Sequence, residues 1–82
     1  MKILYFASLK ELIGKGEDTY HIDGQKKIYQ IIDELKNSNT NYNIAFTKIK
    51  NLQYAVNCEY VNKESFVTNN DELAIFPPVT GG

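Results

Sequence analysis

A single amphipathic helix sets the main constraint on how this 82-residue chain can fold. Its pattern lies in residues 25–37, QKKIYQIIDELKN, where apolar residues recur at the helical spacing i, i+3, i+4 and i+7: Ile28, Ile31, Ile32 and Leu35. One helix can cover only one face of a β-sheet, so the other face must meet solvent or a partner. We therefore expect an α+β roll, in which a sheet wraps around one main helix.

Short segments with strand-like patterns supply the sheet. They are residues 2–7, 18–23, 52–57, 60–61 and 72–76. The first two form a hairpin interrupted by a short helix over residues 9–13. We expect Ser8 and Glu11 to begin that helix as a capping box, and the glycines after it to end it.

Polar residues break the pattern after the main helix. Residues 37–41 are expected to form this break, and residues 44–50 to hold another helical turn. Pro77 and Pro78 end the last strand, because proline cannot donate to a sheet ladder. We expect residues 1–82 to form one domain, with residues 77–82 as a projecting tail.

The composition excludes several classes of protein. The net charge is −1 and the only strong cation is lysine, so the chain lacks the arginines typical of nucleic-acid binding. Cys58 is the only cysteine, which excludes a disulfide framework and is more typical of a small filler than of a reactive site. No pair of residues has zinc-ligand spacing, and we expect no bound metal. The sequence contains no signal peptide and no run of apolar residues long enough to cross a bilayer, so we expect a cytoplasmic protein without membrane contact.

The alternation of side chains along the strands predicts an apolar outer face. Ile3, Leu73 and Ile75 should pack on the helix, because the charged Lys2 and Glu72 mark the other side of their strands. Four residues then point outward, joined by Tyr60 from its short strand: Leu4, Phe6, Ala74 and Phe76. An exposed apolar patch of this kind often marks an interaction site. The alternative is that the sheet curls and the short helix at residues 8–13 covers these side chains.

The sequence ends in Phe76-Pro77-Pro78-Val79-Thr80-Gly81-Gly82, which places two glycines directly after an apolar strand and two prolines. Glycine has no Cβ and can enter passages too narrow for other residues. The carboxylate of Gly82 would be the only functional group at the end of the tail. We expect the prolines to stiffen the base of the tail, so that an activating enzyme could thread the end.

Three segments make the family resemblance specific: LYFASLKELIG at 4–14, AVNCEYV at 55–61 and DELAIFPPVTGG at 71–82. Together they resemble the small sulfur-carrier subunits of molybdopterin synthase, a ubiquitin-like β-grasp family. The resemblance implies a β-grasp roll with a mixed sheet of four to five strands packed on one main helix. It also implies a non-catalytic carrier that binds no cofactor of its own and is active only with the large subunit of the synthase.

The resemblance further implies a chemical role for the tail. A ubiquitin-activating-type enzyme would use ATP to adenylate Gly82, and sulfur would then replace the adenylate to give a thiocarboxylate. Gly81 would keep the end narrow. The large subunit would contact Phe6, Tyr60 and Phe76, and the tail from Pro77 to Thr80, including Pro78 and Val79, would enter its active site.

Other functions use the same features. The chain could carry sulfur in a different pathway, such as that of thiamine, or it could be a protein modifier joined through Gly82 to lysines of target proteins. A β-grasp binding module with an inert tail is the simplest alternative.

Overall fold

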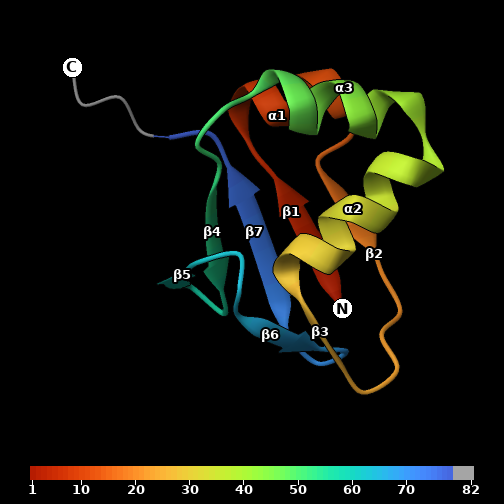
Figure 1. Cartoon of the computed structure of the whole chain (residues 1–82). Coiled ribbons are helices and arrows are strands. Elements are labelled where there is room, and N and C mark those ends of the chain that lie inside the picture. The colour runs from red at the N-terminus through yellow and green to blue at the C-terminus, as the bar shows by residue number, and fades with distance from the viewer. Residues whose placement is uncertain (79–82) are drawn as a thin grey trace.

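The computed structural model describes residues 1–78 and contains ten helices and strands in that range. They follow the chain in this order (Figure 1): β1 (Lys2–Tyr5), α1 (Ala7–Ile13), β2 (Glu17–Thr19), β3 (Gln25–Lys27), α2 (Ile28–Ser38), α3 (Thr40–Lys48), β4 (Gln53–Val56), β5 (Glu59–Val61), β6 (Phe66–Thr68) and β7 (Glu72–Phe76).

A mixed five-stranded sheet forms the main layer, with the strand order β2-β1-β7-β4-β5. The central strands β1 and β7 run parallel, with Ile3 opposite Leu73, and the other neighbours are antiparallel. Helix α2 lies across the sheet, and α1 and α3 gather at the end toward which β1 and β7 point (Figure 1). The expected α+β class and mixed β-grasp sheet are confirmed.

The core lies between α2 and the inner face of the sheet, as the apolar stripe predicts. Ile28 and Ile31 of α2 are fully buried, and so are Ile3, Leu73 and Ile75 of the central strands. Burying one such side chain contributes about 1.5–3 kcal/mol to folding. This contact therefore fixes which face of the sheet turns inward.

The main helix starts later than its sequence pattern suggests, so the expected range 25–37 is wrong at its beginning. Residues Gln25–Lys27 form β3, which pairs with β6 in a separate two-stranded sheet, Lys26 lying opposite Val67. The apolar stripe begins only at Ile28, and the fully buried Val67 draws the preceding residues into an extended pairing. Strand β6 was not predicted from the sequence.

The predicted polar break contains the start of a third helix. Helix α3 runs from Thr40 to Lys48. The expected helical turn over residues 44–50 is therefore wrong at both bounds, since the helix begins four residues earlier and ends two residues earlier. The side chain of Asn39 caps it by accepting a hydrogen bond from the backbone N–H of Asn41 at 2.7 Å. The run of asparagines resembles a loop, but one of them acts as an N-cap.

Helix α1 begins without the predicted capping box. Its N-cap residue is Phe6, no side chain caps it, and Ser8 lies within the first turn. Ala7 takes a left-handed φ of 53°, which breaks the expected strand 2–7 after Tyr5. The C-terminal end does follow the prediction, because Gly14 caps the helix with a φ of 92°.

The expected strand 18–23 is wrong in its bounds, because β2 covers only Glu17–Thr19. Tyr20 still exchanges backbone hydrogen bonds with Met1, at 2.8 Å and 2.7 Å, and the chain leaves the sheet beyond it. Lys2 opposite Thr19 is the last pair at that end of β1. Ile22 leaves the ladder and enters the core, while His21 stays exposed beside Asp23.

Candidate partner-binding face

The outer face of the sheet carries a continuous row of apolar side chains. The strand register places Leu4 opposite Ala74 and Ala74 opposite Ala55, and Ala55 is in turn opposite Tyr60. These residues therefore line one face across four strands. The predicted outward set, Leu4, Phe6, Ala74 and Phe76 with Tyr60, lies on this face.

Three aromatic rings meet at one part of this row. The ring of Phe76 lies 6.5 Å from that of Phe6 and 5.8 Å from that of Tyr60, in edge-to-face arrangements in both cases. Phe6 is 45% exposed and Tyr60 is 76% exposed. The alternative in which the first helix covers these residues is wrong, because α1 turns Leu9 and Ile13 into the core instead.

These rings border a shallow groove of about 410 Å³. We call it the aromatic groove, and its lining residues are Phe6, Ala55, Cys58, Tyr60, Ala74 and Phe76. Ala55 and Ala74 lie opposite each other on the neighbouring strands β4 and β7. Because their side chains are small, they form the floor of the groove between the aromatic rings. Ala55 and Cys58 were not among the residues predicted for this face. Ala55 alternates with Tyr54 and Val56 along β4, which is a weak signal for it, whereas Cys58 lies in the turn after β4 and has no such signal.

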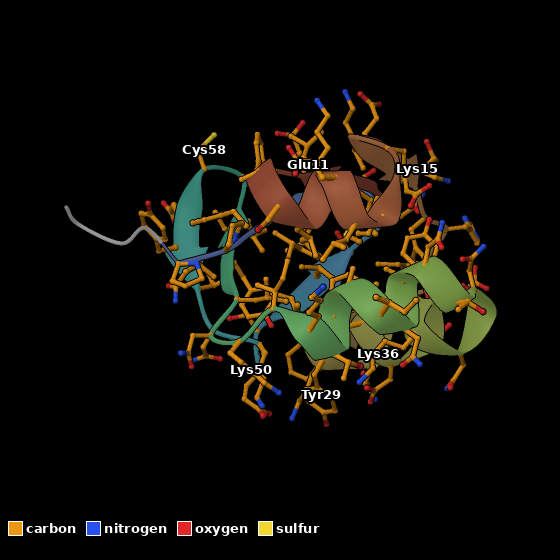
Figure 2. All side chains as sticks on the ribbon, turned by 90° about the horizontal axis from the view of Figure 1, so that it is seen from above. Glu11, Lys15, Tyr29, Lys36, Lys50 and Cys58 are labelled. Carbon is orange, nitrogen blue, oxygen red and sulfur yellow. The ribbon has the colours of Figure 1, made fainter. Side chains whose placement is uncertain are left out.

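Cys58 closes the groove from the turn between β4 and β5. It is exposed, so the prediction of a filler residue is wrong (Figure 2). Asn57 and Cys58 both have left-handed φ angles, 50° and 71°. The Asn57 side chain fixes the turn, since its Oδ1 accepts from the N–H of Glu72 at 3.0 Å and its Nδ2 donates to Asp71 at 2.8 Å.

The base of the tail adjoins the groove. Pro77 and Pro78 follow Phe76 directly and are half-buried. Val79, Thr80, Gly81 and Gly82 lie outside the described residues, and the roles expected for them stay predictions.

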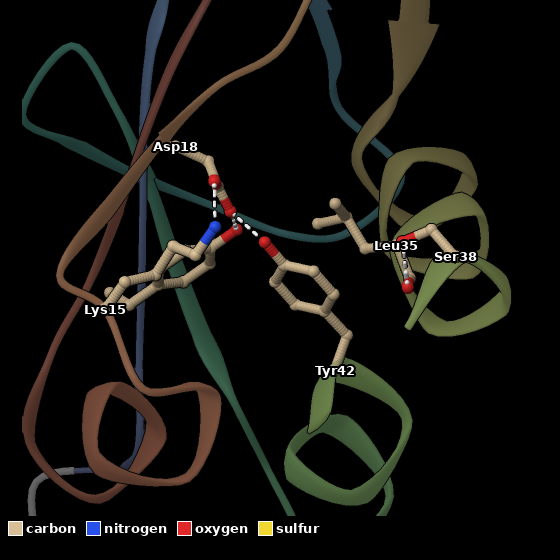
Figure 3. A network of polar contacts seen from close by, with 6 residues as sticks. Lys15, Asp18, Leu35, Ser38 and Tyr42 are labelled. Atoms are coloured by element: carbon tan, nitrogen blue, oxygen red, sulfur yellow. Dashed lines mark hydrogen bonds and ion pairs between the residues drawn. The ribbon is translucent and has the colours of Figure 1, made fainter. Parts of the chain in front are cut away.

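A polar cluster forms around Asp18, and we call it the Asp18 clasp: Tyr5, Lys15, Asp18 and Tyr42. Figure 3 labels Lys15, Asp18 and Tyr42 of this cluster. The hydroxyls of Tyr5 and Tyr42 both donate to Oδ2 of Asp18, the first at 2.8 Å. Lys15 Nζ donates to Oδ1 at 3.0 Å. One carboxylate thus joins β1, β2, α3 and the loop after α1.

The protonation states of the clasp follow from its surroundings. Burial acts to raise the pKa of Asp18, but hydrogen bonds from Tyr42, Lys15 and Tyr5 outweigh it and hold that pKa below its usual value. Burial, and then the bond to Asp18, raises the pKa of Tyr5 far above its usual value. At neutral pH the carboxylate is therefore charged and the Tyr5 hydroxyl remains a donor.

Residues 1–78 contain neither a metal-binding cluster nor a membrane-spanning helix. No group of three or more histidine, cysteine or acidic residues there could hold a metal ion. Within the same range, every helix is too short or too polar to cross a membrane.

Among known protein families, the ThiS family matches residues 3–82 of this chain. The chain belongs to the ThiS family. The matched range includes all of the aromatic groove and the whole glycine tail.

Curated relatives of this ThiS-family chain share one name. It is 37% identical over 86 residues to a protein of Dictyostelium discoideum named molybdopterin synthase sulfur carrier subunit, covering 99% of this chain and 94% of the relative. A protein of the same name from Haemophilus influenzae is 36% identical, with 100% and 99% covered.

Solved structures also resemble the ThiS-family chain. The crystal structure of SAMP1 from Haloferax volcanii has a TM-score of 0.77 at 25% identity, covering 100% of this chain and 98% of that one. The solution structure of the small archaeal modifier protein 1 from Methanosarcina acetivorans has a TM-score of 0.68 at 19% identity, with 99% and 94% covered, and supports the fold alone.

Proposed function

We propose that this chain is the sulfur-carrier subunit of a molybdopterin synthase. The observation that carries the proposal is the full-length similarity to relatives of that name, which runs through the tail to Gly82. The aromatic groove supports it, because an exposed apolar face next to Pro77 and Pro78 is a surface that a partner receiving the tail would be able to cover.

The chemistry of the proposal lies at the carboxylate of Gly82. A carboxylate is a poor acyl donor, so an activating enzyme would first join it to the α-phosphate of ATP, forming an acyl-adenylate and releasing pyrophosphate. A sulfide-level nucleophile from a sulfur donor would then attack the acyl carbon and displace AMP, which leaves a thiocarboxylate. Gly81 and Gly82 present no side chain that would obstruct these steps.

In this proposal the chain has two protein partners. The ubiquitin-activating-type enzyme would load the tail with sulfur. The large synthase subunit would dock on Phe6, Tyr60 and Phe76 and receive the tail from Pro77 onward, where the thiocarboxylate would give its sulfur to a cyclic pyranopterin precursor. The large subunit would supply the acid–base groups, in keeping with a carrier that binds no cofactor itself. We place these steps in the cytoplasm, where ATP is available and the free thiol of Cys58 would stay reduced.

Intact mass spectrometry tests the loading step. The full chain is incubated with ATP, its activating enzyme and a sulfur donor, with a chain that lacks Gly82 as the control. We expect the mass change of one oxygen replaced by sulfur in the full chain only. An unchanged mass under conditions in which the enzyme releases pyrophosphate would contradict the proposal.

Two alternatives have their own support. The family match to ThiS keeps open a carrier role in a different pathway, which would appear as co-purification with a thiazole synthase-like enzyme. The similarity to SAMP1 favours a protein modifier, which would appear as conjugates that survive boiling with a reductant.

A further inference from the structure

The position of Phe6 depends on a strained turn. Phe6 is the first residue after β1, and it lines the aromatic groove at the end of that strand. The next residue, Ala7, has a φ of 53°, a region that L-residues other than glycine rarely adopt. Such a conformation persists only where the surrounding structure holds it in place.

The Asp18 clasp supplies that hold on the strand side of the turn. Tyr5 immediately precedes Phe6 and is only 1% exposed. Its hydroxyl donates to Asp18 at 2.8 Å and its backbone N–H donates to the carbonyl of Gly16 at 2.9 Å, so both ends of the residue are bound to the segment that forms the start of β2. Tyr42 brings α3, which packs against α1, to the same carboxylate.

We infer that Asp18 is a positioning residue for partner docking, because its clasp on Tyr5 and Tyr42 holds the strained turn that directs Phe6 into the aromatic groove. Tyr5 points toward the core and Phe6 points toward the outer face of the sheet. Asp18, which binds Tyr5 on the inner side, would therefore control the position of Phe6 on the outer side. The inference rests on the proposed function, in which the large synthase subunit docks on this groove.

A matched carboxylate provides the control. Glu34 in α2 also accepts from a tyrosine and a lysine: Tyr20 donates to it at 2.5 Å, and Lys26 donates to its other oxygen. Glu34 does not line the groove. The pair Asp18→Asn and Glu34→Gln therefore makes the same chemical change at two places, of which only one is connected to Phe6.

The experiment measures the Kd of each full-length variant for the large synthase subunit by calorimetry, at a temperature where all are folded. We expect Asp18→Asn to bind about fivefold more weakly, the equivalent of about 1 kcal/mol of strain released in the Ala7 turn. Glu34→Gln should bind like the parent. Adding Ala7→Gly to Asp18→Asn should restore most of the affinity, because glycine adopts the left-handed conformation without strain.

A spectroscopic readout separates positioning from general stability. The rings of Phe6 and Phe76 lie 6.5 Å apart, so NMR cross-peaks between them should weaken in Asp18→Asn and persist in Glu34→Gln. If Asp18→Asn does not fold, Tyr5→Phe removes only the hydroxyl and should weaken binding in the same direction.

Three outcomes would overturn parts of this reasoning. If Asp18→Asn binds like the parent, or if Ala7→Gly does not restore its affinity, the positioning inference is wrong while the proposed function stands. If Phe76→Lys also binds like the parent, the groove is not the docking face, and the docking step of the proposed function fails with it.

Discussion

Replacing Cys58 by glycine should stabilise the protein. Asn57 and Cys58 form the turn between β4 and β5, with φ angles of 50° and 71°. Two-residue hairpins with positive φ at both positions favour Asn-Gly, because the second position is unfavourable for any residue with a Cβ. The structure therefore shows a suitable asparagine followed by a residue under strain.

The size of the effect is a difference between two terms. An L-residue in the left-handed region costs about 1–2 kcal/mol, and glycine avoids this cost. Glycine also destabilises the folded state by about 0.5–1 kcal/mol, because it increases the conformational entropy of the unfolded chain. Because the Cys58 side chain is exposed, little packing is lost. The net gain is about 0.7 kcal/mol, which for a domain of this size raises Tm by about 4 °C.

Thermal and urea unfolding of three proteins would measure it. Cys58→Ala is the matched control, since it removes the thiol but keeps the Cβ, and we expect its Tm to stay close to that of the parent. A Cys58→Gly protein no more stable than Cys58→Ala would refute the strain argument. It would show that the turn tolerates a Cβ at φ 71° without cost.

Three further predictions concern the clasp, the groove and the tail. The folded-state pKa of Asp18 lies below its unfolded value, so its stabilisation is present above about pH 4 and is lost as the pH falls through the folded pKa. Urea midpoints should therefore separate the parent from Asp18→Asn at neutral pH and converge in acid, and an equal separation at both pH values would contradict this. Phe76→Lys should weaken binding of the large subunit with little change in Tm, because the ring is on the outer face; a large fall in Tm would place it in the core instead. Removing Gly82 should abolish sulfur loading and leave the circular dichroism spectrum unchanged, and loading of the shortened chain would refute the role of that carboxylate.

Local patterns in the sequence were sufficient for part of the fold. The spacing of Ile28, Ile31, Ile32 and Leu35 predicts both a helix and its buried face, because side chains three and four residues apart share one side of a helix. Alternation along residues 2–6 and 72–76 likewise predicts which side chains point outward. The patterns failed at residues 25–27 and 37–41, where the short-range signal was polar and long-range pairing or capping decided the structure.

The relation between these elements came only from the tertiary structure. The sequence by itself determined one buried helical face, an apolar outer row and an end made of glycines. It did not determine that Ala55 lies opposite Ala74, or that Tyr5, Asp18 and Tyr42 meet at one carboxylate. Contacts between residues far apart in the chain depend on strand register and on how the layers close over the core, and neither leaves a periodic trace in the sequence.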